Sequence, residues 1–324
     1  MERVVGIWVA YDGTDFCGWQ RQQAIANCQL PIANYQSPNA NRQSAIDNRQ
    51  STSGNRVRTV QGLLEEAIQR VVRHPIHLIG SGRTDSGVHA AGQVASFVTT
   101  CPLPADRLAH AVGSRLPHDL AVLAVRDVHP EFNARTSAVS KLYRYRIHNA
   151  PIRPVKNLTQ RYTYHVWHPL DVDRMRAAAA YFVGEKDFAA LAGRDSTSRT
   201  TVRTVFRCDI RSVTDCQLPI TNCQLPIDKA SEEVWVEVEG SGFLYHQVRN
   251  IVGTLLNVGL GRWDPDRIPG ILNSRDRSQA GPTAPALGLC LQWVCYPSHL
   301  LETSKSRRAG IETSKQAIGN WQQA

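Results

Sequence analysis

The sequence predicts an α+β protein made of two similar halves that follow one another along the chain, with a boundary near 131–138. Its length of 324 residues suits two domains that each bury a core of their own. Strand-like alternation and helical periodicity are interspersed in both halves, and neither half consists of one element type alone. A hydrophobic content of 42% and a charged content of 20% are ordinary for a globular protein.

The first half begins with a strand at 3–11, followed by the polar, glycine-containing loop YDGTDFCGWQRQ. An amphipathic helix starts after Thr59, a suitable N-cap, because apolar residues recur at helical spacing from Val60 to Val72. The next elements are expected as strands at 76–80 and 92–99, a helix at 104–115, and strands at 120–128 and 139–148.

The second half repeats this mixture of elements. Its helices are expected at 171–183, 244–258 and 264–273, and its strands at 199–211, 233–240 and 288–296. No apolar run approaches the roughly 18 residues of a membrane span, and the first residues form a strand pattern that does not resemble a signal peptide. We therefore expect no membrane association and a cytoplasmic location.

Three polar segments do not fit this pattern. Residues 24–56 are rich in Asn, Gln, Ser and Ala, and their pentamer CQLPI recurs twice near 214–230. The residues after 297 repeat the tetramer ETSK and are also polar. We expect two disordered insertions at about 24–56 and 214–230. The predicted organisation is then an N-terminal half, a C-terminal half and a disordered tail, at 1–135, 136–297 and 298–324.

Charge and cysteine usage limit the possible partners and metals. The net charge of +9 favours a polyanionic partner, and nucleic acid before membrane, because no basic amphipathic helix stands out. None of the eight cysteines forms a CxxC pair, which is typical of reduced residues in a core. The closest histidine pairs, at 74/77 and 165/168, have no nearby Cys or acidic third ligand, so we expect no structural zinc.

The first candidate for chemistry is Asp85, which lies within GSGRTDSGVHA at 80–90. An aspartate between glycines is usually a turn former that bonds its own backbone. Two features favour a functional role. The loop leaves a strand, where a rigid sheet can position a side chain. It also carries Arg83, so a cation that could hold a phosphate accompanies the carboxylate in one tight loop.

A second candidate lies in the predicted strand KLYRYRI at 141–147. Strand alternation places Tyr143 and Tyr145 on one face and the arginines on the other. The ordinary interpretation is a sheet with aromatic residues inside and arginines in solvent, and we apply it to Tyr145 and Arg146. A tyrosine that faces a cleft beside basic residues can instead stack on a base, which makes Tyr143 a candidate.

A third candidate is Arg249, within the predicted helix of GFLYHQVRNIVG at 242–253. Leu244 and Val248 belong to the buried stripe of this helix, and Arg249 adjoins them. A partly buried arginine needs a carboxylate partner, because an unpaired charge away from water costs several kcal/mol. Asp85 is a candidate for that partner. The alternative is a solvated arginine on the outer face of the helix.

Taken together, these motifs carry a resemblance to a known family. YDGTDFCGWQRQ, GSGRTDSGVHAAGQV, KLYRYRI and FLYHQVRNIVG occur in this order. With them the chain resembles the TruA family of tRNA pseudouridine synthases, and APALGLCLQWVCY resembles the last strand of that family. The resemblance covers about 3–23, 57–211 and 232–296. The insertions and the tail depart from it, and so does Gln247, where Met is common.

The resemblance implies a fold and an activity. The expected fold consists of two ferredoxin-like halves that form one extended, mostly antiparallel sheet flanked by helices. The family acts as a homodimer that converts uridines 38, 39 and 40 in the anticodon stem-loop of tRNA to pseudouridine, and it uses no cofactor or metal. By position, Asp85 is the catalytic aspartate and Tyr143 packs on the target base. Arg83 assists base extrusion and backbone contact, and Arg249 pairs with the catalytic aspartate.

The reaction explains why a carboxylate is needed. The C1′–N1 bond must break, the base must turn, and C1′ must join C5, so the base stays in the site and no cosubstrate is required. An ionised carboxylate can attack the sugar or abstract a sugar proton, and the sequence leaves both open. Two alternatives are a related synthase acting on other tRNA uridines and an RNA-binding protein without catalysis. A zinc deaminase is disfavoured, because its P-C-x-x-C motif is absent.

Overall fold

The computed structural model describes residues 2–21, 57–153, 161–193, 198–214 and 232–302. The expected insertion at 24–56 therefore lies outside the described residues. So does the insertion expected at 214–230, apart from Thr214, which ends a strand.

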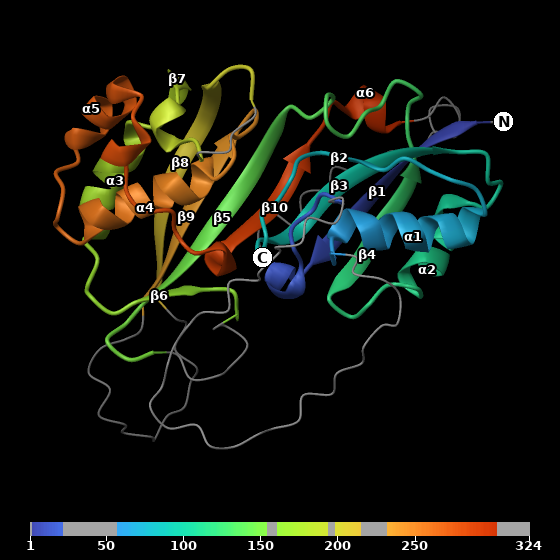
Figure 1. Cartoon of the computed structure of the whole chain (residues 1–324), viewed down its shortest axis with the longest axis horizontal. Helices are drawn as coiled ribbons and strands as arrows, with labels where there is room; N and C mark the ends of the chain where they lie inside the picture. Colours follow the sequence, from blue (N-terminus) through green and yellow to red (C-terminus); the bar gives the residue numbers. More distant parts are fainter. Residues whose placement is uncertain (1, 22–56, 154–160, 194–197, 215–231, 303–324) are drawn as a thin grey trace.

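The described strands form one extended sheet of ten strands (Figure 1). Eight of them follow the order β4-β1-β3-β10-β5-β9-β8-β7, while β2 lies beside β3 and β6 beside β5. All pairings are antiparallel except β10 with β3 and β5 with β6. The expectation of one extended, mostly antiparallel sheet is confirmed.

The first half has the ferredoxin-like order of elements. Its elements are β1 (Arg3–Tyr11), α1 (Val60–Val72), β2 (Ile79–Gly80), β3 (His89–Thr99), α2 (Ala105–Gly113) and β4 (Leu120–Asp127). This is the series β-α-β-β-α-β, and in the sheet the fourth strand is followed by the first, the third and the second. The strand expected at 76–80 is shorter than expected, and the one expected at 92–99 begins earlier, at His89.

The second half repeats the same order with two additional short strands. Its elements are β5 (Ser140–Asn149), β6 (Tyr164–Val166), α3 (Val172–Ala180), β7 (Gly184–Asp187), β8 (Val202–Thr214), β9 (Glu232–Gly240), α4 (Gln247–Gly259), α5 (Arg267–Ser274) and β10 (Leu289–Cys295). Without β6, β7 and the additional short helix α5, the series is again β-α-β-β-α-β, and the order β10-β5-β9-β8 is the ferredoxin-like one. The sequence did not predict β6 and β7, which are too short to show a period.

The two halves meet where β10 pairs with β3. β10 runs antiparallel to β5 on one side and makes a short parallel pair with the start of β3, at His89 and Ala90, on the other. β2 occupies the same edge of β3 further along. The loop between β2 and β3 therefore turns at the seam between the halves. The boundary near 135 stays a prediction, and it falls between the end of β4 and the start of β5.

The helices lie against the sheet (Figure 1), and α1, α3 and α4 bury apolar residues. Thr59 caps α1 as expected, because its hydroxyl accepts a hydrogen bond from the Gly62 amide at 3.3 Å. The predicted stripe of this helix is buried, as are most residues of α4. One hydrophobic cluster contains buried residues of both halves. Among the described helices, none combines the length and the apolarity needed to cross a membrane.

A second, smaller cluster corrects the expected disordered tail. Residues 298–301 form the short helix α6 (Ser298–Leu301), and the Leu300 carbonyl accepts a hydrogen bond from the His129 amide at 3.0 Å. Leu300 and Leu301 pack on a cluster that includes Phe132 and Tyr296. The tail prediction is wrong for this turn, because its two leucines cover apolar surface. Residues 303–324 lie outside the described residues.

The arginines of β5 also differ from expectation. Arg146 was expected in solvent; its side chain is 33% exposed, and it forms an ion pair with Glu233 on the neighbouring strand β9. Arg144 binds Glu237 at 2.8 Å, and the Glu237 side chain is only 2% exposed. A buried carboxylate on β9 requires such cations, because a charge removed from water must be paired. Tyr145 is fully buried, as expected.

Candidate active site

The loop at 81–88 joins β2 to β3 and presents Asp85 at the seam. The Val88 amide donates to the Asp85 carbonyl at 3.2 Å, which closes a tight turn. Gly87 has φ +78°, a left-handed conformation that favours glycine. Because of this turn, the Asp85 side chain lies in a partly buried position with 18% of its surface exposed.

The loop after β1 braces one side of this turn. The Thr84 carbonyl accepts a hydrogen bond from the Trp19 amide at 3.1 Å, and the Thr84 hydroxyl lies 2.8 Å from the Tyr11 hydroxyl. Gly18 has φ +87°, and a Cβ there would lie 2.8 Å from the Thr84 carbonyl oxygen. The motif YDGTDFCGWQ therefore supports the Asp85 loop, and Gly18 permits the close approach of the two loops.

The other end of the loop is held by two side-chain donors. Lys141 at the start of β5 donates to the Ser81 carbonyl at 2.5 Å, and the Gln93 amide donates to the Gly82 carbonyl at 3.0 Å. Burial lowers the pKa of Lys141 to about 8, and the charge of Arg135 adds to the effect. Lys141 of the KLYRYRI motif thus fixes the backbone just before Arg83.

Helix α4 brings Arg249 to Asp85. The Arg249 Nη1 atom lies 3.2 Å from Asp85 Oδ2, and the two side chains are 14% and 18% exposed. The Arg249 Nε atom donates to the Ala284 carbonyl at 2.7 Å, which orients the guanidinium. The predicted pairing of these residues, 164 positions apart, is confirmed, and the alternative of a solvated Arg249 is excluded.

His246 is a neighbour of Asp85 that the sequence reasoning missed. Its Nε2 atom lies 3.5 Å from the same Oδ2 atom that Arg249 contacts. His246 precedes α4 with φ +61°, a left-handed conformation that is uncommon for a residue other than glycine. Helical spacing does not indicate this approach, because His246 lies just before the helix in that left-handed conformation.

Gln247, the residue that departs from the family pattern, is completely buried at the start of α4. Its Oε1 atom accepts a hydrogen bond from the Leu244 amide at 2.8 Å. Its Nε2 atom has no hydrogen-bond partner among the described residues. Gln247 therefore belongs to the packing at the start of α4, and the ion pairs of Asp85 are made by its neighbours His246 and Arg249.

Tyr143 lies in the same region but is mostly covered. Only 8% of the residue is exposed, and its ring packs edge to face on Phe243 with 5.4 Å between centroids. Burial raises the pKa of its hydroxyl above the ordinary value, and the nearby Tyr11 and Asp85 contribute to the rise. Tyr143 therefore carries a neutral hydroxyl, and the Asp85 carboxylate lies near enough to disfavour its ionisation.

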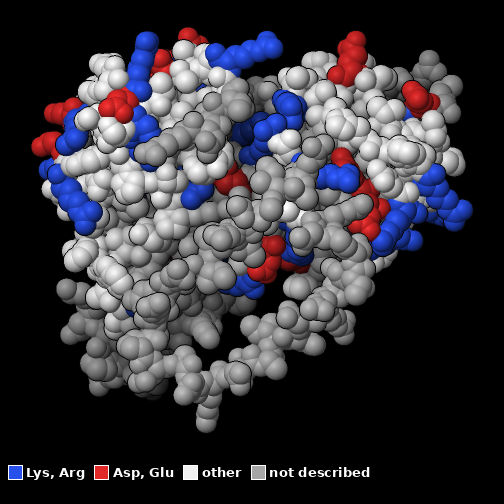
Figure 2. Space-filling model, viewed as in Figure 1, with Lys and Arg blue, Asp and Glu red and all other residues white. Residues whose placement is uncertain are grey.

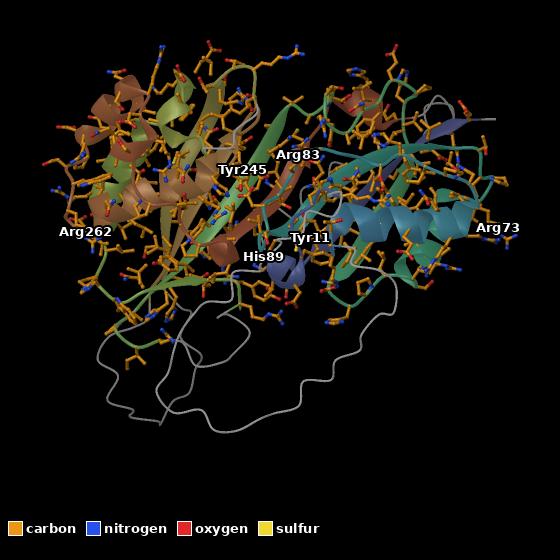
Figure 3. All side chains as sticks on the ribbon, viewed as in Figure 1. Tyr11, Arg73, Arg83, His89, Tyr245 and Arg262 are labelled. Carbon is orange, nitrogen blue, oxygen red and sulfur yellow. The ribbon has the colours of Figure 1, made fainter. Side chains whose placement is uncertain are left out.

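Arg83 is exposed, and its guanidinium makes no ion pair among the described residues. Asp85 is therefore held by Arg249 of the other half and not by the arginine two positions away. Figure 3 shows Arg83 and Tyr245 near the middle of the molecule, where the halves meet. Figure 2 shows Lys and Arg side chains in the middle of the same face and on both flanks.

His89, at the end of the loop motif, is a second residue that the sequence reasoning missed. The Gly13 amide donates to His89 Nδ1 at 3.0 Å, so this atom is the acceptor, and Nε2 donates to the Leu287 carbonyl at 3.2 Å. Burial lowers the pKa of His89, and the Asp12 carboxylate at 3.2 Å partly opposes this. Neutral His89 joins the β1 loop to the segment before β10.

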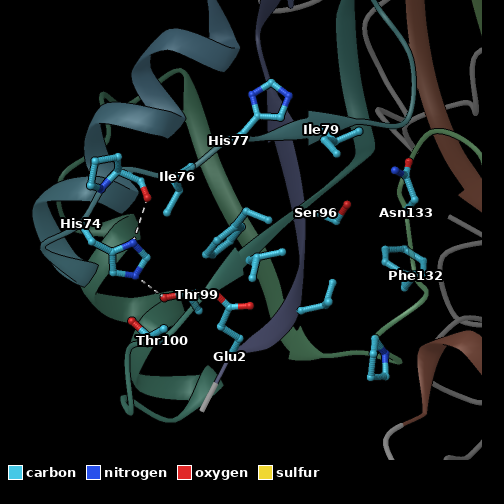
Figure 4. A pocket seen from close by; sticks show the side chains of 15 residues that line it. Glu2, His74, Ile76, His77, Ile79, Ser96, Thr99, Thr100, Phe132 and Asn133 are labelled. Carbon is cyan, nitrogen blue, oxygen red and sulfur yellow. Dashed lines mark hydrogen bonds between the residues drawn. The ribbon is translucent and has the colours of Figure 1, made fainter.

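A groove of about 860 Å³ lies away from these residues, over the first half of the sheet (Figure 4). His74 and Ser96 are among the residues that line it, and it contains none of the four predicted site residues. His74 bonds the Thr99 hydroxyl at 2.8 Å. In the described parts of the chain, no group of His, Cys, Asp or Glu side chains is arranged to hold a metal ion.

Comparison with known proteins places this geometry in a family. A family model described as tRNA pseudouridine synthase matches residues 44–136 and 178–297. The chain belongs to the tRNA pseudouridine synthase family. The matched residues include the loop of Asp85 and the helix of Arg249, whereas Tyr143 lies between the two matched stretches.

Individual relatives of the family match nearly the whole chain. A protein of Acetivibrio thermocellus named tRNA pseudouridine synthase A is 38% identical over 294 residues, which cover 91% of this chain and 100% of that protein. Proteins of the same name are 38% identical over 295 residues in Thermoanaerobacter pseudethanolicus and 40% identical over 293 residues in Syntrophotalea carbinolica. These matches cover 91% and 90% of this chain, and 100% and 96% of the two relatives.

Proposed function

We propose that this chain isomerises uridine to pseudouridine in tRNA, at positions 38, 39 and 40 of the anticodon stem-loop. The observation that carries the proposal is a carboxylate, Asp85, held by a cation at the seam of a pseudouridine synthase fold. The relatives named tRNA pseudouridine synthase A support the substrate class. The net charge of +9 fits a polyanionic RNA.

Asp85 is the proposed catalytic group, as nucleophile or as base. Arg249 and His246 both approach Oδ2, and among the described residues no hydrogen bond or ion pair to Oδ1 is found. We assign Oδ1 as the oxygen that acts on the sugar. Arg249 places a cation 3.2 Å from the carboxylate, and both versions of the reaction use an ionised carboxylate.

Tyr143 and Arg83 are proposed to bind the substrate. Removing a uridine from a stem costs a few kcal/mol. Packing of the extruded base against the exposed part of Tyr143 can return about 1–3 kcal/mol. The exposed Arg83 guanidinium is available to contact the RNA backbone and to assist extrusion, because no side chain among the described residues forms an ion pair with it.

We also propose that the protein acts as a homodimer in the cytoplasm, and that its two halves divide near residue 135. The dimer follows from the family resemblance. The location fits the lack of a membrane-spanning helix in the described part of the chain. The division fits the gap between β4, which ends at Asp127, and β5, which begins at Ser140.

The test is to incubate unmodified tRNA with the purified protein and to map pseudouridine along the product. We expect pseudouridine at positions 38, 39 and 40 where the substrate has uridine there. Pseudouridine only at other positions would indicate a synthase with a different target. Tight RNA binding without any pseudouridine would indicate an RNA-binding relative and would overturn the proposal.

A further inference from the structure

Tyr245 is an exposed aromatic ring beside the candidate active site. It has 43% of its surface exposed, whereas Tyr143 and Tyr11, the other tyrosines of the site, are 8% and 5% exposed. Figure 3 shows Tyr245 toward the middle of the molecule in this view. A large exposed aromatic side chain at the edge of a binding site is a common recognition element for unpaired nucleobases.

The ring of Tyr245 is held in a fixed orientation. It stacks on the imidazole of His246, with 3.8 Å between centroids and 24° between planes. His246 in turn lies 3.5 Å from Asp85 Oδ2, so only one ring separates Tyr245 from the catalytic carboxylate. A side chain that is already ordered loses little conformational entropy when a ligand binds to it.

Gly193 provides the space for this arrangement. Its amide donates to the Tyr245 carbonyl at 2.8 Å. A Cβ at position 193 would lie 2.6 Å from Tyr245 Cδ1 and 3.3 Å from His246 Nδ1. A larger residue there would displace the stacked pair, so the absence of a side chain at Gly193 lets Tyr245 occupy its position.

We propose that Tyr245 is a second base-binding subsite, on which an unpaired nucleobase next to the target uridine stacks. The inference rests on the proposed function, because it takes the substrate to be RNA with one base extruded to Asp85. Extrusion breaks the stacking of the neighbouring base as well. An ordered aromatic ring one side chain away from the carboxylate can replace that stacking contact.

The test compares Tyr245→Leu with the matched control Phe206→Leu, in steady-state kinetics on an anticodon stem-loop RNA. Phe206 is a similarly exposed aromatic residue, at 47%, on β8. We expect Tyr245→Leu to raise KM at least about fivefold with kcat little changed, and Phe206→Leu to leave both unchanged. Tyr245→Phe should behave as wild type, because it keeps the ring.

A binding measurement separates this inference from the proposed function. The RNA carries 2-aminopurine at one of the two nucleotides that flank uridine 39, and the protein is the Asp85→Asn variant, which we expect to bind RNA without turnover. Stacking should quench the fluorescence of one of the two labelled RNAs, and Tyr245→Leu in the same background should abolish the quenching. An unchanged KM, a loss of kcat alone or persistent quenching in Tyr245→Leu would overturn the inference. Failure of the wild type to make pseudouridine would instead refute the proposed function.

Discussion

The pair of Asp85 and Arg249 joins the two halves, and removing its cation should be costly. Breaking a buried ion pair from one side typically costs about 3–5 kcal/mol, because the remaining charge has lost its partner. Here the side chains keep 18% and 14% exposure, and His246 stays 3.5 Å from the carboxylate. We therefore expect Arg249→Met to lower the free energy of unfolding by the smaller figure, about 3 kcal/mol.

A double-mutant cycle measures the contact itself. Urea unfolding of wild type, Asp85→Asn, Arg249→Met and the double variant should give a coupling free energy of at least about 1 kcal/mol. The double variant should be no less stable than Arg249→Met, because the unpaired charge is gone. The exposed pair of Glu66 and Arg70 on α1 is the control, with an expected coupling below about 0.5 kcal/mol. A coupling near zero for Asp85 and Arg249 would refute their contact in solution.

Three further predictions concern pH and salt. Burial lowers the pKa of His89 below its ordinary 6.5, so the unfolded chain binds the proton more readily than the folded protein. The free energy of unfolding, measured by urea titration at several pH values, should therefore fall as pH drops below 6.5. It should fall less in His89→Gln. Burial lowers the pKa of Lys141 from 10.5 to about 8. The free energy of unfolding of the wild type, relative to that of Lys141→Met, should therefore rise by about 2–3 kcal/mol between pH 8 and pH 10.5. A difference that does not change with pH would show that the amine is hydrated. The logarithm of the tRNA binding constant should fall linearly with the logarithm of salt concentration, with a slope of roughly −0.7 to −0.9 per phosphate contacted. An affinity that does not depend on salt would argue against tRNA as the substrate.

Long elements, in which apolar residues recur at regular spacing over many residues, could be predicted from the sequence. The strand at 3–11 and the helix after Thr59 follow from apolar residues at regular spacing, and both are present. The strands β6 and β7 have three and four residues, and pairing with a neighbouring strand creates them. A strand that forms through such a tertiary contact shows no regular spacing of apolar residues in the sequence. The short helix α6 escaped prediction for the same reason.

In the candidate site, too, some residues could be predicted from the sequence and others could not. Arg249 could be identified because a charge beside a buried helical stripe needs a partner, although the choice of Asp85 also relied on the family resemblance. The sequence placed Arg83 and Asp85 in one loop and assigned Arg83 to phosphate, and Arg83 is exposed in the structure. His246 was missed because its approach to Asp85 depends on a left-handed backbone conformation at the start of α4. No local pattern predicts that conformation for a histidine.

The catalytic role of Asp85 is tested most directly by measuring pseudouridine formation by Asp85→Asn, which keeps the shape of the side chain and removes its charge. We predict no detectable product from an anticodon stem-loop under conditions where the wild type reacts completely, with RNA affinity little changed. Asp127→Asn, which removes a carboxylate paired with Arg3 on the outer strands, should keep wild-type activity. Turnover by Asp85→Asn at even a tenth of the wild-type rate would contradict the account.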